Sequence, residues 1–293
     1  MDIVHHAFIG GIGYMGFASN QHELAGMAFV AGSVLPDLDV AFMAFGKRAY
    51  LRNHQGLTHS LLLAPLFAFL FIALPMSFHL GFDYVVFLAA LAGIWTHSLL
   101  DYSNTFGITL FWPLSRKRFC IDALFFIDSI AWLLTLTTYI AYFYNNENVF
   151  IYYAIALIVY ALFKHQLQLR VKQHLNSELA IPSALNPFDF YILLEKDNSI
   201  TTYRYNTITT KQNDLHHYSN DQQQYSHLVK KSDVYKDMKE LTRYFFITSV
   251  NSIDGNTEIT IKDLGIRNFG GKFAETRLVF SDKGELISEM ANI

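Results

Sequence analysis

Residues 91–101 read Leu-Ala-Gly-Ile-Trp-Thr-His-Ser-Leu-Leu-Asp, and they close one of the most apolar segments of the chain. His97 and Asp101 are four residues apart, so on a helix their side chains share one face and can reach one cation. A buried hydrogen bond that fastens one helix to another is the alternative. Because ionisable groups beside hydrocarbon are costly unless they are paired or coordinated, the segment predicts a polar site at the end of an apolar helix.

Long apolar segments surround this one and indicate a membrane protein. Four stretches have the length and composition of membrane spans, at about 60–82, 84–101, 121–143 and 149–165. A span needs roughly 20 apolar residues, and the second and fourth stretches lie near the short limit. A large soluble helical core is the alternative. It is disfavoured because 61–78 and 131–144 contain no charged residue, whereas buried soluble helices usually keep a polar stripe.

The charges between these segments predict which side of the membrane each loop occupies. Basic residues gather before the first span, between the second and third, and after the fourth: Lys47, Arg48, Arg52, Arg116, Lys117, Arg118, Lys164, Arg170 and Lys172. The opposite connections, around 81–83 and 145–148, contain no lysine or arginine. The positive-inside rule then places both termini and the long loops in the cytoplasm, as expected of a multi-pass protein of a bacterial inner membrane.

The composition divides the chain into two parts. Of its 22 lysines and arginines, 13 lie in 183–293, and the net charge of −3 argues against a nucleic-acid-binding protein. We expect an all-α polytopic membrane domain over 1–175, with about four spans plus short N-terminal helices. A linker over 176–187 and a small β-rich (α+β) cytoplasmic domain over 188–293 follow.

Within the second part, segments rich in β-branched and aromatic residues predict strands at 188–194, 200–208, 258–263 and 276–281. The polar stretch 214–226 is expected to be a loop, and 232–243 a helix. Nothing in this part indicates a function. The single cysteine, Cys120, allows no disulfide within a monomer.

The N-terminal part supplies further candidates for the polar site. Residues 4–34 predict two short helices whose glycines permit close packing, and Pro36 ends the second of them. Asp37 and Asp39 then lie in a turn, where they either approach a cation or cap the next helix. His6 lies on the first short helix and is a plausible ligand.

Other ionisable residues fall on the same predicted side of the membrane. His54 and His59 precede the first span in Arg-Asn-His-Gln-Gly-Leu-Thr-His-Ser, and an ordinary interfacial histidine is the alternative for each. Asp128 is expected several residues inside the third span, where a carboxylate needs a partner. Histidines and aspartates with unrelated structural roles should not all lie on one side of the membrane. Together these residues therefore predict a metal site.

The chemical set consists of histidines and carboxylates without a second cysteine. This set favours Zn²⁺, with Mn²⁺ or Fe²⁺ as alternatives, over a thiolate-rich structural zinc site. More than four candidate ligands suggest one to three ions, and two-metal sites are typical of phosphoryl chemistry. The sequence contains no His-Glu-x-x-His, Gly-x-Ser-x-Gly or phosphate-binding glycine loop, so the corresponding protease, hydrolase and nucleotidase classes lose support.

The order of these residues resembles the YdjM family, bacterial inner-membrane proteins described as metal-dependent hydrolases. The resemblance covers about 1–175 and rests most specifically on Arg-x-His54-x-Gly-x-Thr-His59-Ser. It also includes Leu-Pro-Asp37-Leu-Asp39 and His97-x-x-x-Asp101-x-x-Asn104-x-x-Gly107. The motif His-x-x-x-Asp would be weak evidence if it stood alone.

The family is in turn distantly similar to zinc-dependent phospholipase C and its nuclease relatives, which are all-helical enzymes with zinc held by His and Asp. That similarity implies that His97, Asp101 and His59 are metal ligands and that Asp37 or Asp39 is the carboxylate near the reactive water. Those relatives are secreted, and they use their N-terminal amine as a ligand. A chain that stays in the membrane departs from this pattern, so one zinc position has no counterpart.

The sequence therefore predicts a membrane-embedded hydrolase of a phosphoester, with a phospholipid or lipid-linked phosphate as substrate and membrane lipid as partner. The expected metal ligands are His6, His54, His59, His97, Asp101 and Asp128; the expected bases are Asp37 and Asp39; the expected substrate-binding residues are Arg52, Asn104, Arg116 and Arg118. A non-catalytic metal-binding sensor or adaptor is the main alternative. A transporter would place ionisable groups near the bilayer midplane instead.

Overall fold

Helices form the first part of the chain and two antiparallel sheets form the second, which confirms the predicted fold class. This computed structural model describes 2–77, 83–144, 148–196, 199–265 and 275–292. The chain separates into two units, Met1–Gln166 and Leu167–Ile293, each of which is described by itself. The division falls inside the last long helix rather than at the predicted linker.

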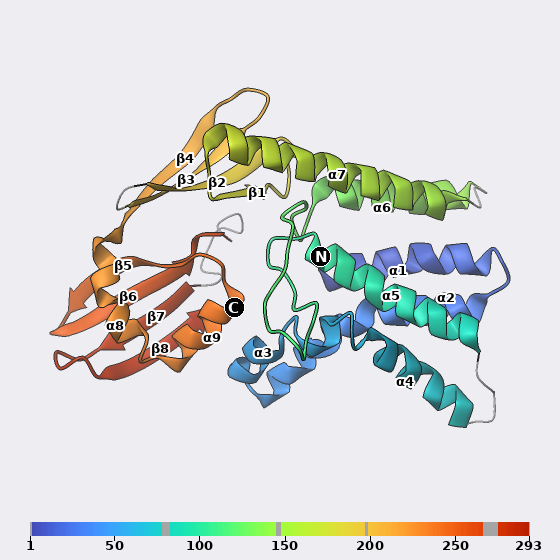
Figure 1. Cartoon of the computed structure of the whole chain (residues 1–293), viewed down its shortest axis with the longest axis horizontal. Helices are drawn as coiled ribbons and strands as arrows, with labels where there is room; N and C mark the ends of the chain where they lie inside the picture. The colour runs from blue at the N-terminus through green and yellow to red at the C-terminus, as the bar shows by residue number, and fades with distance from the viewer. Residues whose placement is uncertain (1, 78–82, 145–147, 197–198, 266–274, 293) are drawn as a thin grey trace. The chain divides into compact units, whose positions relative to one another are not determined.

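The first unit is built from helices joined by short turns on one side and long connections on the other. In chain order they are α1 (Ile3–Ala18), α2 (Glu23–Val34), the 3-10 helix η1 (Leu35–Phe45), α3 (Lys47–Asn53), η2 (Leu57–His59), α4 (Ala64–Ser77), α5 (Tyr84–Tyr102), α6 (Ser129–Phe143) and α7 (Val149–Leu175). Figure 1 shows α1, α2, α5, α6 and α7 running roughly along one direction, with α2, α5 and α7 opposite in sense to α1 and α6. Residues 35–63 and 103–128 therefore meet at one end of this bundle.

Three helices in the described part of the chain are long and apolar enough to cross a membrane: Glu23–Phe45, which is α2 continued by η1, then α5 and α7. The spans predicted at 84–101 and 149–165 lie within α5 and α7. In the first expected span, α4 begins at Ala64 rather than at about residue 60, and the predicted end at 78–82 lies outside the described residues. The α-helix α2 ends at Val34, next to Pro36 as expected, but η1 follows it directly, so the helical segment 23–45 is longer than the short helix expected there.

The third predicted span requires a second correction. The helix α6 begins at Ser129, and the residues from 121 to 128 form an irregular segment instead of its first two turns. Asp128 is the N-cap residue, and its side chain accepts hydrogen bonds from the backbone N–H groups of Ile130 and Ala131. Asp128 thus starts the helix rather than lying inside it, as an N-capping carboxylate does elsewhere.

Glycines let α2 and α5 pack backbone against backbone. A Cβ atom on Gly32 of α2 would lie 2.3 Å from the carbonyl oxygen of Ala90, and one on Gly93 of α5 would lie 2.3 Å from the carbonyl oxygen of Phe29. Real Cβ atoms do not approach oxygen so closely, so only glycine permits this separation. The contact matters for function because Gly93 precedes His97 by one helical turn.

Replacing Gly93 by alanine is therefore expected to push α5 away from α2 and to destabilise the folded protein. Overpacking a close-packed contact costs about 1–3 kcal/mol, so we expect a lower melting temperature in detergent. The matched control is Gly255→Ala in the second unit, where a Cβ would meet nothing within 4 Å. Gly255 has a positive φ of 79°, so that variant measures backbone strain alone. An equal loss for both variants would contradict the packing argument.

The second unit contains two four-stranded antiparallel sheets, each in simple sequential order. The strands are β1 (Leu179–Pro182), β2 (Asp189–Lys196), β3 (Ser199–Asn206), β4 (Gln212–Ser219), β5 (Phe245–Ile253), β6 (Asn256–Asp263), β7 (Glu275–Phe280) and β8 (Leu286–Asn292), with η3 (Asn220–Tyr225), α8 (Ser226–Val229) and α9 (Asp233–Leu241) between β4 and β5. Alternate residues of β2 and β3, among them Phe190 and Tyr203, pack with Val171 of α7 in one core. The helix predicted over 232–243 corresponds to α9.

Two predictions for this unit were wrong. The segment expected as a linker, 176–187, contains β1, which pairs with β2. The segment expected as a loop, 214–226, contains most of β4, which pairs with β3 at the edge of its sheet. Side chains on both faces of β4 are largely exposed, so the strand lacks the apolar alternation by which a strand is recognised.

Candidate metal centre

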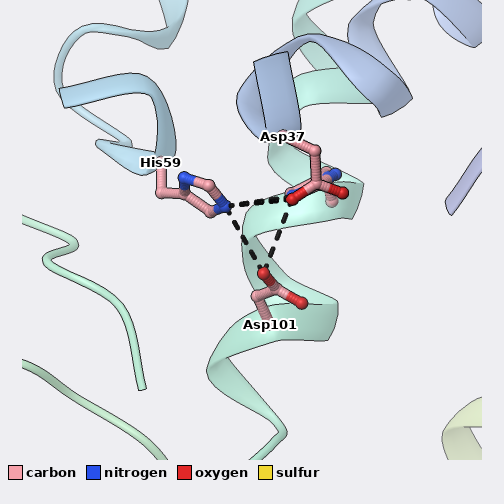
Figure 2. Close-up of side chains that lie close together, drawn as sticks. Asp37, His59 and Asp101 are labelled. Atoms are coloured by element: carbon pink, nitrogen blue, oxygen red, sulfur yellow. Dashed lines mark hydrogen bonds and ion pairs between the residues drawn. The ribbon is translucent and has the colours of Figure 1, made fainter. Parts of the chain in front are cut away.

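Two histidines and two aspartates from three separate segments converge at one end of the helical unit. Asp37 lies in η1, His59 ends η2, and His97 and Asp101 lie one turn apart on α5. One ligand atom from each of the four lies within 4.8 Å of the others. Figure 2 shows Asp37, His59 and Asp101 pointing toward one another from these elements. Nitrogen and carboxylate ligands arranged in this way suit a divalent transition metal.

A backbone carbonyl orients His97 so that its Nε2 faces the other members of the cluster. Its Nδ1 lies 2.7 Å from the backbone carbonyl oxygen of Ser33, and only a protonated Nδ1 can donate to a carbonyl. In the neutral ring, Nε2 then carries a lone pair, and it faces Asp37 Oδ1 and Asp101 Oδ2 at 3.6 Å each. His59 Nε2 lies closer, at 3.2 Å, so either a proton on His59 Nε2 or a metal bound between these groups would satisfy the lone pair. Backbone carbonyls commonly orient metal-bound histidines in this way.

Two neighbouring side chains hold one carboxylate oxygen of Asp101 and leave the other oxygen facing the cluster. Its Oδ1 lies 3.1 Å from His6 Nε2 and accepts a hydrogen bond of 3.3 Å from the side-chain amide of Asn104. The amide orientation is fixed, since Asn104 Oδ1 accepts from the backbone N–H groups of Phe106 and Gly107. Asp101 Oδ2 is left facing His59 Nε2 at 3.4 Å. Asn104, expected as a substrate-binding residue, is placed as a positioning residue.

Replacing Asn104 by alanine is expected to weaken metal binding without removing it, because Asp101 keeps its charge but loses one of its orienting donors. Substitutions of this kind typically cost about 10–100-fold in metal affinity. Competition against a chromophoric chelator would measure the loss in the purified protein. Asn186→Ala serves as the control, since that side chain caps a turn in the second unit. Equal affinities for wild type and Asn104→Ala would contradict the positioning role.

Asp37 is the most accessible member of the cluster. Its side chain is 14% exposed, whereas those of His59, His97 and Asp101 are at most 1% exposed. Its Oδ1 faces His59 Nε2 at 3.8 Å, and its Oδ2 is buried with no hydrogen-bond partner among the described residues. A buried carboxylate oxygen is rarely left without a partner, so this atom has capacity for a cation or for water.

His59 is fully buried, and that burial lowers the pKa of its imidazole below the usual value, although the bond to Asp101 opposes the shift. The neutral ring is the form that binds a metal. On the other edge of the ring, Nδ1 lies 3.2 Å from Thr58 Oγ1 and 3.9 Å from Asp39 Oδ2. Asp39 of η1 and Thr58 thus contact the edge of the His59 ring that faces away from the cluster.

Asp39 and His54 pair with each other beside the cluster. Asp39 Oδ1 lies 3.2 Å from His54 Nδ1, and Asp39 Oδ2 accepts a 2.7 Å hydrogen bond from the backbone N–H of Gln55. The side chain of His54 is 29% exposed. Asp39 therefore connects η1, to which it belongs, with the turn before His59, and His54 lies outside the four-residue group.

His6 joins the cluster from α1, whereas Asp128 is placed elsewhere. The rings of His6 and His97 stack with their centroids 3.6 Å apart, and His6 Nδ1 is buried with no hydrogen-bond partner among the described residues. Asp128, expected as a ligand, accepts hydrogen bonds from Tyr160 Oη at 2.9 and 3.2 Å in addition to its bonds with the start of α6. Through these hydrogen bonds Asp128 connects the start of α6 to α7.

The three arginines expected to bind substrate have different surroundings. Arg52 on α3 and Arg116 in the loop after α5 are exposed. Arg118 donates to the carbonyl oxygen of Gly107 at 2.9 Å and to the side chain of Gln55. Its guanidinium therefore joins the loop after α5 to the turn before η2, and the role in substrate binding expected from the sequence stays a prediction.

Two groups that hold the cluster were not predicted from the sequence. The carbonyl of Ser33 orients His97, and a backbone oxygen leaves no signature in a sequence. The backbone N–H of Gln55 fixes Asp39, and Gln55 adopts a positive φ of 56°. The only available signal was Gly56, which follows Gln55 in a turn that requires unusual backbone angles.

The helical part of the chain is similar to known proteins. The family model described as YdjM inner membrane protein matches residues 1–169. The uncharacterized protein YfhP of Bacillus subtilis (strain 168) is 28% identical over 157 residues, which cover 51% of this chain and 47% of that protein. The chain thus spans about half the length of this curated relative. No solved structure matches.

The matched residues include the four members of the cluster and His6 beside them. They leave out almost all of the sheet-containing unit. The resemblance seen in the motifs around Asp37, His59 and His97 is therefore supported over the whole helical part. The chain belongs to the YdjM family of inner membrane proteins.

Proposed function

We propose that the protein is a metal-dependent hydrolase of the inner membrane that cleaves a phosphoester of a phospholipid or a lipid-linked phosphate. The observation that carries the proposal is the buried convergence of Asp37, His59, His97 and Asp101 within 4.8 Å. The basic residues at the ends of the predicted spans support a cytoplasmic location for this site and for both termini.

The residues present fit a divalent transition metal. Two neutral imidazoles and two carboxylates match the donor set of catalytic zinc, with Mn²⁺ or Fe²⁺ as alternatives. His97 Nε2 faces two carboxylate oxygens at 3.6 Å and His59 Nε2 at 3.2 Å, so one cation could contact all of these atoms. A divalent metal bound by such ligands lowers the pKa of water and stabilises negative charge on a phosphoryl oxygen.

We assign proton transfer, ligand positioning and phosphate binding to side chains of the protein. Asp37 is the ligand-capable carboxylate with access to solvent, and we assign it the proton released by the attacking water. Asn104 and His6 hold Asp101, and the carbonyl of Ser33 holds His97. Arg52 and Arg116 are exposed on α3 and the loop after α5, so they are the candidates for binding a phosphate.

Purified protein reconstituted in vesicles of phosphatidylethanolamine and phosphatidylglycerol provides the direct test. After loading with Zn²⁺ or Mn²⁺, we expect release of a phosphorylated head group, or hydrolysis of bis(4-nitrophenyl) phosphate, that a His59→Ala/His97→Ala variant lacks. Metal bound without turnover of any phosphoester would contradict the hydrolase proposal. That result would favour the alternative, a metal-binding membrane sensor or adaptor.

A further inference from the structure

An apolar groove lies beside the metal cluster in the helical unit. It has a volume of about 810 Å³ and is lined mainly by α1, α5 and α7, with Phe29 of α2 and Leu124 completing the wall. Its wall consists mainly of aliphatic and aromatic side chains, among them Ile9, Leu99, Leu100, Ala154 and Leu157. The volume lies within the roughly 300–1,000 Å³ that is usual for ligand sites.

The groove has the length of one membrane leaflet. Its lining on α7 runs from Phe150 to Ala161, which corresponds to about 16 Å at the rise of an α-helix. Half of a hydrocarbon core is about 15 Å thick. Few polar side chains line it: Thr96 and Ser103 on α5 and its cap, Asn20 and His22 after α1, and Tyr153 on α7, whose hydroxyl pairs with Thr135. An apolar chain of that length with a polar end group suits this distribution.

The dimensions also exclude a helix as occupant. A helix about 16 Å long and about 10 Å across would fill more than roughly 1,200 Å³, well above the volume of the groove. Flexible hydrocarbon chains are the apolar molecules that a bilayer supplies in quantity. The groove is therefore better suited to an acyl chain than to a transmembrane partner.

One end of the groove adjoins the metal cluster. Leu100 and Ser103 line it, and they immediately precede Asp101 and Asn104 on the same helix and its cap. On α1, Ile9 lines the groove one turn after His6, whose Nε2 lies 3.1 Å from Asp101 Oδ1. His6 and Asp101 thus connect the two helices at the point where the groove ends.

We propose that this groove binds one acyl chain of a membrane phospholipid, with the phosphate of the head group at the metal cluster. The assignment of the phosphate rests on the proposed function, whereas the occupancy of the groove by an acyl chain does not. The consequence is a substrate that enters sideways from the bilayer, already oriented by its hydrocarbon tail.

The test uses a phosphatidylglycerol with a photoactivatable diazirine in one acyl chain, diluted into phosphatidylethanolamine vesicles that contain the full-length protein. After illumination and digestion, we expect adducts concentrated on the groove-lining parts of α1, α5 and α7. Ala154→Trp and Leu99→Trp place an indole at exposed positions of the groove wall. Each is expected to lower the groove adducts by roughly tenfold.

Val159→Trp is the matched control, because Val159 lies on α7 with 59% exposure and does not line the groove. It should leave the adducts unchanged, and bound metal should be equal in all three variants. Adducts spread evenly over exposed helix faces, or unaffected by Ala154→Trp and Leu99→Trp, would overturn the proposal. Groove adducts in a protein that binds no metal would support the lipid site while contradicting the proposed hydrolase.

Discussion

Asp101→Asn is expected to lower metal affinity by about 100-fold or more. The carboxylate is 1% exposed, and its Oδ2 faces both His59 Nε2 and His97 Nε2 within 3.6 Å. An amide of the same shape removes the negative charge that a buried cation needs, and removing one partner of a buried charge pair costs about 3–5 kcal/mol. Competition with a chromophoric chelator in detergent would measure the change.

Asp128→Asn is the matched control for this experiment. Asp128 is equally buried, but it caps α6 and accepts hydrogen bonds from Tyr160. We expect this variant to bind metal as tightly as the wild type. Loss of metal on replacing Asp128, with metal retained on replacing Asp101, would contradict the four-residue centre and would restore Asp128 as a ligand.

Asp37→Asn is expected to lower the turnover of a phosphoester substrate by about 10²–10⁴-fold, the range typical of a lost general base. The amide cannot accept the proton from the attacking water, although it fills the same space in η1. Initial rates in reconstituted vesicles loaded with saturating metal would measure the effect, so that any weaker metal binding does not enter the result.

Asp39→Asn separates the two carboxylates that the sequence left as alternative bases. Asp39 faces His54 and the backbone of Gln55, so the variant should reduce stability more than turnover per bound metal. If Asp39→Asn abolished turnover and Asp37→Asn did not, the base would be Asp39 and the assignment made here would be incorrect.

Local patterns carried much of the fold and of the candidate site. The spacing of His97 and Asp101 puts them on one helix face, and the apolar segments around them place that face at the end of a membrane helix. Pro36 marks the change from α2 to η1 that brings Asp37 to the same end. These relations depend on spacing and on the cost of burying charge, both of which a single sequence records.

The remainder depended on contacts between distant segments. An aspartate is a possible N-cap, but the residues before Asp128 are as apolar as those after it, so the sequence did not separate a helix start at Ser129 from a site inside a longer span. The exposed strand β4 has no alternating pattern because it lies at a sheet edge. The carbonyl of Ser33 reaches His97 only because Gly32 and Gly93 let two helices approach closely, which is a property of the packed pair.

Metal content by mass spectrometry tests the central claim most directly. Detergent-purified wild-type protein, grown with added zinc and manganese, is predicted to retain about one equivalent of transition metal for each cluster of four ligands. A folded His59→Ala/His97→Ala variant is predicted to retain none above background. Wild-type protein without metal, or a variant that keeps it, would contradict the existence of this metal centre and with it the proposed hydrolase.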